Sequence, residues 1–264
     1  MLDKMDKDGM MIPAERREKI VSIVENQGVV SLAELANSLK VSMITIRRDL
    51  KTLAAEQKVQ LVFGGVRSNR RMNDEPNRVF FAKRAIPQKR AIAAQAYKMI
   101  PEGSCIYLDA GTTTLALAEC LNGRADLTVV TNDFVVSDYL IKNSKCKLIH
   151  TGGTVSKESF SCNGSFSALA LKNYSIDLAF VSSPAWCLQG IKTSAEEKVA
   201  TKQALLICAK RRVLLCDSDK FGNDATYLAL PLSAFDTIIT DNGLKKEARE
   251  GILKINLTLI TVPY

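Results

Sequence analysis

The chain has 264 residues and a formal net charge of +8, and this basic balance favours a polyanionic partner. It has no apolar run of about 18 residues, and residues 1–9 mix charges without an apolar core. These features argue against a membrane-spanning protein and a signal peptide, so we expect a cytoplasmic protein. The seven cysteines are scattered without C-x-x-C pairs, which indicates reduced thiols and argues against a structural zinc site. No metal or cofactor is expected.

Residues 31–50 carry the signals of two short helices joined by a tight turn. Ser31, with Glu34 at the N3 position, predicts a capping box at the start of the first helix, and Ser42 predicts the start of the second. One side of the second helix is apolar and is expected to face a small core through Met43, Ile46, Leu50 and Leu53. This arrangement is typical of a helix-turn-helix.

The opposite side of the second helix suits a DNA groove. It carries Ile44, Thr45, Arg48 and Lys51, with Arg47 on the flank. Guanidinium groups bind guanine edges or phosphates, a hydroxyl bonds to bases, and an apolar group contacts the thymine methyl. The alternative is an ordinary amphipathic helix pair with a solvated charged face. Against it, residues 40–71 contain eight Lys or Arg and only two acids, and an outward Ile44 suits a groove better than water.

Residues 59–67 predict a β-hairpin wing with glycines at its turn. Such a wing presses a backbone turn against phosphates. Together with the helices it predicts a winged helix-turn-helix domain over residues 11–67 that binds double-stranded operator DNA. The candidate DNA-binding residues are Ser31, Ser42, Ile44, Thr45, Arg47, Arg48, Lys51, Gly64 and Gly65.

The T-I-R-R-D-L run at residues 45–50 and the following Phe63-Gly64-Gly65 resemble the N-terminal domain of the DeoR family of bacterial transcriptional regulators. The resemblance continues along nearly the whole chain. Two positions depart from the family pattern, since Gln57 or Lys58 stands where a glycine is usual and Phe63 where a histidine is frequent. Both departures lie around the wing and leave the helix motif intact.

Residues 68–88 change in composition and predict a linker, in which Phe80 and Phe81 dock onto one of the domains. A helix is expected over residues 89–99. Short apolar runs rich in β-branched residues then alternate with helical stretches, which predicts a parallel sheet covered on both faces. The sequence therefore predicts a doubly wound, mostly parallel α/β domain over residues 89–264. Its expected strands are residues 105–108, 127–130, 146–149, 178–181, 213–216, 237–239 and 257–261.

Polar residues follow the expected strands, and ligands of open α/β sheets bind beyond these carboxyl ends. The clearest loop is residues 111–114, a glycine followed by threonines at the start of a helix. Such a helix N-terminus is an anion cradle, most naturally for phosphate, although the loop lacks the lysine of a nucleotide P-loop. The alternative is a capped turn whose threonines satisfy the backbone. Gly152 and Gly153, at the same predicted sheet edge, favour binding.

Charged residues at this edge are further candidates. Asp109 and Asp217 suit hydrogen bonds from ligand hydroxyls. Lys220 suits a phosphate or carboxylate, with a local salt bridge to Asp217 as the alternative. Lys202 is a weaker candidate, because a single helical lysine usually lies at the solvated surface. Trp186 and His150 are expected to pack in the core.

The D-A-G-T-T-T, T-N-D, T-G-G and D-S-D-K-F-G segments resemble the C-terminal sensor domain of the DeoR family, which is similar in fold to ribose-5-phosphate isomerase and CoA transferases. This resemblance implies binding of a phosphorylated sugar or sugar-acid effector. By matching motif it gives a ligand-binding role to Asp109, Gly111, Thr112, Thr113, Thr114, Thr131, Asn132, Gly152, Gly153, Asp217 and Lys220. Residues 182–186 and the acidic pair Glu196 and Glu197 depart from the family pattern, so the identity of the effector does not transfer.

These features together predict a transcriptional regulator without catalytic residues. It would repress a carbohydrate or sugar-acid operon and be released by its effector. One helix-turn-helix reads only a half-site, so a homo-oligomer, a dimer or tetramer, is expected. The rival function is an isomerase-like, sugar-phosphate-binding enzyme with an accessory DNA module, for which Asp109, Glu197, Asp217 or Lys220 would supply the base.

Overall fold

The computed structural model describes residues 11–264 except Gly28, Gln57, Phe63 and residues 69–76. Residues 1–10 and the departures noted at Gln57 and Phe63 therefore lie outside the described residues. The chain forms two compact units, residues 1–72 and residues 73–264. Each unit has its own hydrophobic core.

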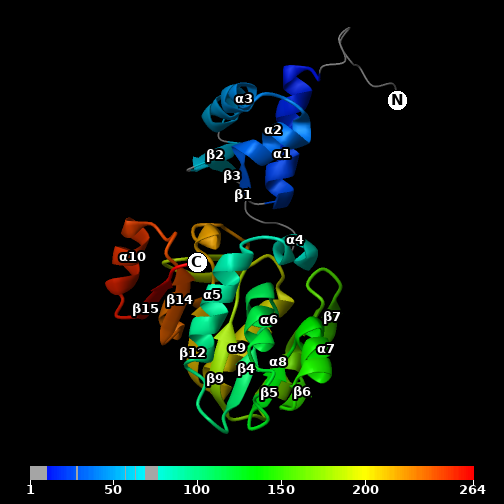
Figure 1. Ribbon diagram of the computed structural model, residues 1–264, viewed down its shortest axis with the longest axis vertical. Helices are drawn as coiled ribbons and strands as arrows, with labels where there is room; N and C mark the ends of the chain where they lie inside the picture. Colours follow the sequence, from blue (N-terminus) through cyan, green and yellow to red (C-terminus); the bar gives the residue numbers. More distant parts are fainter. Residues whose placement is uncertain (1–10, 28, 57, 63, 69–76) are drawn as a thin grey trace. The chain divides into compact units, whose positions relative to one another are not determined.

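The N-terminal unit packs helices α1, α2 and α3 against a small antiparallel sheet (Figure 1). Strands β1 and β2 each pair with β3, in the order β1-β3-β2. The wing is the β2–β3 hairpin, so the predicted winged helix-turn-helix is confirmed. The elements are α1 (Pro13–Gln27), β1 (Val29–Ser31), α2 (Leu32–Leu39), α3 (Met43–Ala55), β2 (Val59–Val62) and β3 (Gly65–Ser68).

Local side-chain caps begin both helices of the motif. Glu34 N donates to Ser31 Oγ at 3.1 Å while Ser31 N donates to Glu34 Oε2 at 2.9 Å, which confirms the capping box. Thr45 N donates to Ser42 Oγ at 3.2 Å at the start of α3. Lys40 ends α2 in the left-handed conformation with a φ of 53°, and this residue makes the tight turn between the helices.

The apolar side of α3 packs into the small core as expected, with one exception. Ile46, Leu50 and Leu53 are buried. The prediction was wrong for Met43, which is 44% exposed. Met43 is the first residue of α3, and its side chain therefore leaves from the helix end, where no preceding turn lies beneath it.

In the C-terminal unit, the described residues form a seven-stranded parallel sheet in the order β15-β14-β12-β9-β4-β5-β6. Every predicted strand lies in this sheet, and the predicted α/β class is confirmed. The strands are β4 (Cys105–Leu108), β5 (Thr128–Thr131), β6 (Lys147–His150), β9 (Ile176–Val181), β12 (Ala209–Leu215), β14 (Thr237–Asp241) and β15 (Thr258–Val262).

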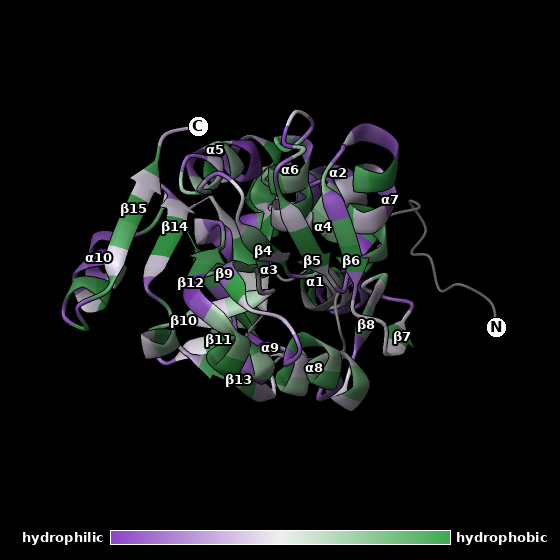
Figure 2. Ribbon diagram, turned by 90° about the horizontal axis from the view of Figure 1, so that it is seen from below, coloured by the Kyte–Doolittle hydropathy of each residue, from purple (hydrophilic) through white to green (hydrophobic). Residues whose placement is uncertain are grey.

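Helices cover both faces of this sheet (Figure 2). One face carries α5 (Ile86–Tyr97), α6 (Thr112–Glu119) and α7 (Phe134–Asn143). The other carries α8 (Ser165–Leu171), α9 (Glu197–Cys208) and a small sheet of β10 (Ala185–Cys187), β11 (Gly190–Thr193) and β13 (Tyr227–Pro231). The remaining elements are α4 (Arg78–Ala82), the hairpin β7 (Thr154–Ser156) and β8 (Ser161–Asn163), the 3-10 turns Ser218–Lys220 and Leu232–Ala234, and α10 (Lys246–Leu253).

Part of the predicted linker belongs to the C-terminal unit. Residues 78–82 form α4, and α5 begins at Ile86 rather than at residue 89. Pro87 lies in the first turn of α5, where its fixed φ favours the start of a helix. The buried Lys89 Nζ donates to the carbonyls of Phe81 and Arg84 and so ties α5 to α4. The side chain of Phe80 lies outside the described residues.

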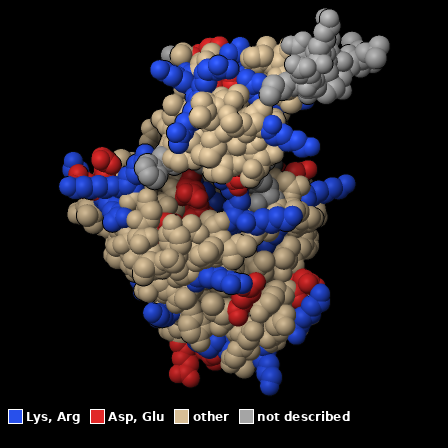
Figure 3. Space-filling model, turned by 45° about the horizontal axis from the view of Figure 1, so that its top comes forward, with Lys and Arg blue, Asp and Glu red and all other residues tan. Residues whose placement is uncertain are grey.

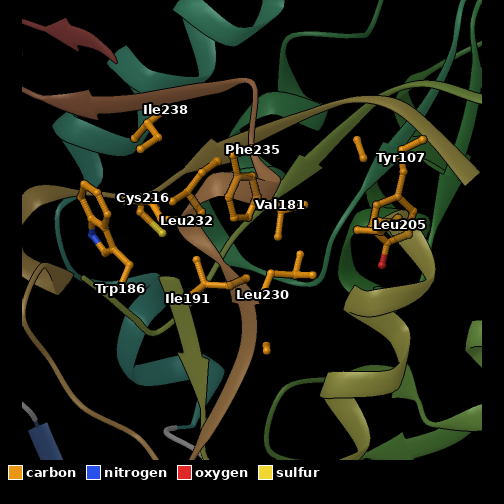
Figure 4. Close-up of a cluster of buried hydrophobic side chains, with 14 of the residues drawn as sticks. Tyr107, Val181, Trp186, Ile191, Leu205, Cys216, Leu230, Leu232, Phe235 and Ile238 are labelled. Atoms are coloured by element: carbon orange, nitrogen blue, oxygen red, sulfur yellow. The ribbon is translucent and has the colours of Figure 1, made fainter. Parts of the chain in front are cut away.

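Strand β4, next to the central strand β9, separates two hydrophobic cores. Tyr107 points toward the core under α8 and α9, while Ile106 and Leu108 point toward the core under α5, α6 and α7. Figure 4 shows the first core, in which Trp186 is fully buried as predicted. The Trp186 indole meets Phe221 edge-on at 4.8 Å between ring centroids, and its Nε1 donates to Asp217 O at 3.2 Å.

Among the described residues, no helix has the length and apolarity needed to cross a bilayer. Cys105, Cys120, Cys146, Cys162, Cys187, Cys208 and Cys216 are free thiols. The described His, Cys, Asp and Glu side chains form no group that could hold a metal ion.

A buried ion pair joins α1 to α3, and its removal gives the first test. Arg16 Nε donates to Asp49 Oδ2 at 2.6 Å, and both side chains are buried. Asp49→Ala would leave the guanidinium buried without its counter-charge, so we expect the free energy of unfolding of the N-terminal unit to fall by about 3 kcal/mol. Urea unfolding followed by circular dichroism measures this change. Glu15→Ala, which removes only an exposed pair with Lys19, is the control and should leave stability nearly unchanged; equal losses in both variants would contradict the prediction.

Candidate functional site

The outer face of α3 presents the side chains that the sequence proposes for DNA. Ile44 is 79% exposed, and Arg47, Arg48 and Lys51 are also exposed. Thr45 is half-buried, and its hydroxyl lies 2.9 Å from Ser42 Oγ. Figure 3 shows Lys and Arg side chains over the visible face of this unit, with few acidic side chains among them. Cations around an exposed isoleucine match the chemistry of a major groove.

The other proposed DNA-contacting residues have defined structural tasks. The hydroxyls of Ser31 and Ser42 cap α2 and α3. Gly64 is exposed at the tip of the wing with a φ of 73° and open space around its Cα. A Cβ at Gly65 would lie 2.5 Å from Val30 O, so glycine there allows β1 to approach β3. Gly64 is thus the better placed of the two for a backbone contact with phosphate.

A cavity opens in the C-terminal unit beyond the carboxyl ends of β4 and β9. Its walls come from α4, the start of α6, β8, the loop after β9, α9 and the turn after β12. The lining residues are Arg78, Phe81, Asp109, Ala110, Gly111, Thr112, Ser159, Asn163, Ser182, Ser183, Pro184, Lys198, Lys202 and Lys220. It therefore contains five of the predicted effector-binding residues: Asp109, Gly111, Thr112, Lys202 and Lys220.

Asp109, at the end of β4, is buried in one wall of this pocket. Its carboxylate forms an ion pair with Lys202 and accepts a hydrogen bond from Ser182 N at 3.1 Å. Lys202 Nζ also donates to Ser182 O at 2.8 Å. The ion pair therefore joins β4, α9 and the loop after β9, and it holds the Lys202 amine at the pocket wall.

Arg78, the first residue of α4, forms another wall. Its guanidinium pairs with Asp133, and its Nη2 donates to Gly111 O at 3.3 Å. Gly111 N donates to Asp133 Oδ2 at 3.0 Å, while Asp133 Oδ1 accepts the amides of Val135 and Val136 at the start of α7. Burial raises the pKa of Asp133 against the lowering effect of Arg78. One buried pair thus links α4, the predicted anion loop and α7.

Lys220 and Lys198 add two buried amines. Lys220 Nζ lies 3.1 Å from Asp217 Oδ2 and 5.3 Å from the ring centroid of Phe81. Burial disfavours its charge, but Asp217, Cys216 and Asp219 together outweigh this effect, and the pKa of Lys220 is raised. Burial, followed by the charge of Lys202, lowers the pKa of Lys198 to about 7. Near neutral pH, both the protonated and the neutral form of the Lys198 amine are therefore populated.

Four of the predicted ligand-binding residues use or bury their side chains within the protein and do not line this pocket. Thr114 Oγ1 donates to carbonyls of its own loop at 2.6 and 2.9 Å, and Thr131 Oγ1 donates to a carbonyl of β4 at 2.6 Å. Asn132 Nδ2 donates to a carbonyl of β8 at 2.9 Å, and its Oδ1 accepts from Tyr107 at 2.9 Å. Thr113 is fully buried. The alternative reading, in which threonines satisfy the backbone, describes Thr114.

Gly152 and Gly153 also lie outside this lining. Gly153 has a φ of 120°, and a Cβ there would lie 2.7 Å from Asn163 O, so glycine allows the loop to pack on β8. Gly152 N donates to His150 Nδ1 at 3.1 Å, and the half-buried His150 ring stacks on Phe134 at 4.8 Å.

The sequence analysis did not propose several residues of the pocket. Lys198 had a usable signal, since a lysine one turn before Lys202 lies on the same side of a helix. No sequence pattern marked Arg78 as a pocket residue, because its partner Asp133 is 55 residues away in the sequence. The lining residues not proposed as ligand-binding are Arg78, Phe81, Ala110, Ser159, Asn163, Ser182, Ser183, Pro184 and Lys198, although Ser182 and Ser183 are among the polar residues expected after the strands.

Two family models match the chain, one for each unit. A DeoR-like helix-turn-helix domain matches residues 16–72, and a DeoR C terminal sensor domain matches residues 84–242. The chain belongs to the DeoR family of DNA-binding transcriptional regulators.

Relatives share this arrangement over nearly their whole length. The chain is 50% identical over 250 residues to the HTH-type transcriptional regulator YgbI of Escherichia coli K12, covering 95% of this chain and 98% of that protein. It is 31% identical over 255 residues to the lactose phosphotransferase system repressor of Staphylococcus epidermidis, covering 91% and 98%. Ribose 5-phosphate isomerase A of Methanocaldococcus jannaschii aligns with a TM-score of 0.36 and 14% identity, over 51% of this chain and 54% of that one, and no function follows from a similarity of this extent.

The lowered pKa of Lys198 makes the stability of the C-terminal unit depend on pH. The pKa is about 7 in the folded chain against 10.5 for a free lysine, so the unfolded chain binds more protons between these values and stability rises with pH. Between pH 6 and pH 8 this single group should add about 1 kcal/mol to the free energy of unfolding.

The measurement is urea unfolding of wild type and Lys198→Met at both pH values. We expect a smaller rise for Lys198→Met, since that side chain does not titrate. Equal rises in the two proteins would show that Lys198 keeps an ordinary pKa.

Proposed function

We propose that this chain represses transcription from an operator and is released from it by a small anionic metabolite, a phosphorylated sugar or sugar acid. The observation that carries this proposal is the charge of the pocket. Its lining contains four basic side chains, Arg78, Lys198, Lys202 and Lys220. Arg78, Lys202 and Lys220 pair with the carboxylates of Asp133, Asp109 and Asp217, and an anion bound beside Lys198, whose pKa burial lowers to about 7, would favour its protonated form. The Staphylococcus epidermidis relative is named a repressor, which supports repression rather than activation by this chain.

The start of α6 favours an anion on the same side of the pocket. Gly111 and Thr112 belong to the lining, and the first amides of a helix have no acceptor within the helix. Such amides and the partial positive charge of the helix N-terminus bind phosphate or carboxylate. Asp109 and the Ser182 hydroxyl, which lies beside Gly111, suit sugar hydroxyls. The proposed effector therefore combines an anionic group with several hydroxyls.

Release requires that the effector bind more tightly to the arrangement that does not hold DNA. The same linkage makes DNA weaken effector binding by an equal factor. Because one helix-turn-helix reads a half-site, we propose a dimer or tetramer as the operator-binding species. The effector then acts by changing how two DNA modules match their half-sites.

The isomerase-like alternative needs a base that is available to a substrate proton. Asp109, the carboxylate of the pocket lining, is engaged by Lys202 and by Ser182 N. Lys220 is paired with Asp217. These partners favour binding over catalysis.

The DNA-binding half of the proposal is tested at the outer face of α3. Arg48→Ala should raise the operator dissociation constant about 5- to 150-fold and relax discrimination at one base pair, since a bidentate contact to guanine contributes about 1–3 kcal/mol. Lys51→Ala should instead weaken binding to all sequences alike and lower the salt slope by about one. Fluorescence anisotropy on an operator fragment selected from genomic DNA measures both. A folded Arg48→Ala protein with unchanged affinity and specificity would remove Arg48 from recognition.

The effector-binding half is tested at Thr112, which is half-buried in the pocket lining and begins α6. Thr112→Asp places a negative charge where the helix tolerates it but an anionic ligand does not. A saturating ligand, at a hundred times its dissociation constant, should stabilise wild type by about 2.7 kcal/mol. A thermal-shift screen of phosphorylated sugars and sugar acids should show this stabilisation in wild type and Thr112→Asn but not in Thr112→Asp. Equal shifts in all three proteins would place the ligand elsewhere. Thr113, also a candidate, is fully buried and so unsuited to this substitution.

A further inference from the structure

The solvent side of α8 and α9 is almost free of charge. The α8 sequence SFSALAL contains no charged residue, and in α9 the only charged residue after Lys198 is Lys202, which is buried at the pocket. The exposed side chains are instead large and apolar: Phe166 is 74%, Leu169 57%, Leu206 47% and Ile207 73% exposed. Figure 2 shows both helices in predominantly hydrophobic colours. We call these four residues the α8–α9 face.

Other helices of this unit have a different solvent side. The exposed Asp138 and Lys142 of α7 form an ion pair, and α10 pairs Lys246 with Glu250. Both are ordinary amphipathic helices with a charged outer side. The four side chains of the α8–α9 face together expose roughly 400 Å² of apolar surface, the size of the largest apolar patch on a typical monomer, which is frequently functional. It therefore has the character of a contact surface.

The two helices lie side by side and run in the same direction. Gly164 N, at the start of α8, donates to Glu197 O, at the start of α9, at 2.9 Å. The helices lead into neighbouring parallel strands, in which Ile176 of β9 pairs with Ala209 of β12. Their outer sides consequently form one strip, acidic at the beginning with Glu196 and Glu197 and basic at the end with Lys172 and with Lys210, which pairs with Asp177 at 2.8 Å.

We propose that the α8–α9 face binds the same face of a second copy of this chain, with the helices of the two copies antiparallel about a twofold axis. An antiparallel arrangement places the acidic end of each strip opposite the basic end of the other. The apolar residues of two copies would bury about 800 Å², and a polar rim brings the contact to the size of a stable dimer. The inference rests on the proposed function in one respect, since a half-site reader needs a second copy.

This position also connects the interface to the pocket. α9 carries Lys198 and Lys202 on its inner side and Ile207 on its outer side, with the partly exposed Leu206 on the flank between them. A ligand that binds to Lys198 or Lys202 therefore contacts the same helix that would contact the second copy. The surface and the pocket share one rigid element.

The chain offers a matched pair of substitutions for the test. Ile207 lies near the end of α9 and is 73% exposed, while Ile141 lies near the end of α7, on the other side of the sheet, and is 72% exposed. Ile207→Asp places in the proposed interface a charge that faces the acidic Glu196 and Glu197 of the other copy, whereas Ile141→Asp places the same charge in solvent. Sedimentation equilibrium of the full chain at micromolar concentration, without DNA or effector, measures self-association. Phe166→Arg is a second variant of the face.

Wild type and Ile141→Asp should associate equally, and Ile207→Asp and Phe166→Arg should raise the dissociation constant of the dimer at least about tenfold. The aspartate at 207 would lie opposite the acidic end of the other strip and the arginine at 166 opposite its basic end, and a buried charge without a partner is costly. A monomeric wild type overturns the proposal and leaves the face to another occupant. Association that Ile207→Asp does not weaken, or that Ile141→Asp weakens equally, also overturns it. Since no DNA is present, loss of the dimer in Ile207→Asp supports the surface even if wild type fails to bind an operator, a failure that would count against the proposed function alone.

Discussion

The buried ion pair between Asp109 and Lys202 fixes the geometry on which the pocket depends. Asp109 follows strand β4, and Lys202 reaches it from α9, while Ser182 N and O bind the two members of the pair. A second buried pair, Arg78 with Asp133, fastens α4 to the starts of α6 and α7. A buried charge is tolerated only with its partner and further hydrogen bonds, so these pairs specify one arrangement of the loops around the pocket.

The same pairs suit the proposed binding of an anion that can be released. Arg78, Lys202 and Lys220 each face a buried carboxylate, so the cations are held in place without mutual repulsion. An anion bound in the pocket would interact with cations that are already paired with carboxylates, rather than with unpaired charges. Its binding therefore redistributes electrostatic attraction among α4, α6 and α9, which is a physical basis for coupling to elements outside the pocket.

Features set by neighbouring residues could be predicted from the sequence. The capping box of Ser31 and Glu34, the cap at Ser42 and the apolar strand runs are local, and the winged helix-turn-helix and the parallel sheet followed from them. The pocket was predicted only in part. Thr131 and Asn132 carry the right chemistry, but their hydrogen bonds go to β4 and β8, partners that local spacing does not reveal. Arg78 stood in an apparent linker, and only the fold brings it to Asp133.

The central claim is that occupancy of the pocket and binding of the operator are coupled. The most direct test is the anisotropy of a labelled operator fragment titrated with wild-type protein, with and without a saturating amount of the sugar phosphate or sugar-acid phosphate that most stabilises the protein thermally. The account predicts that the operator dissociation constant rises at least about fivefold when the ligand is present, the lower end of ordinary allosteric coupling. An unchanged dissociation constant with the pocket saturated would contradict it.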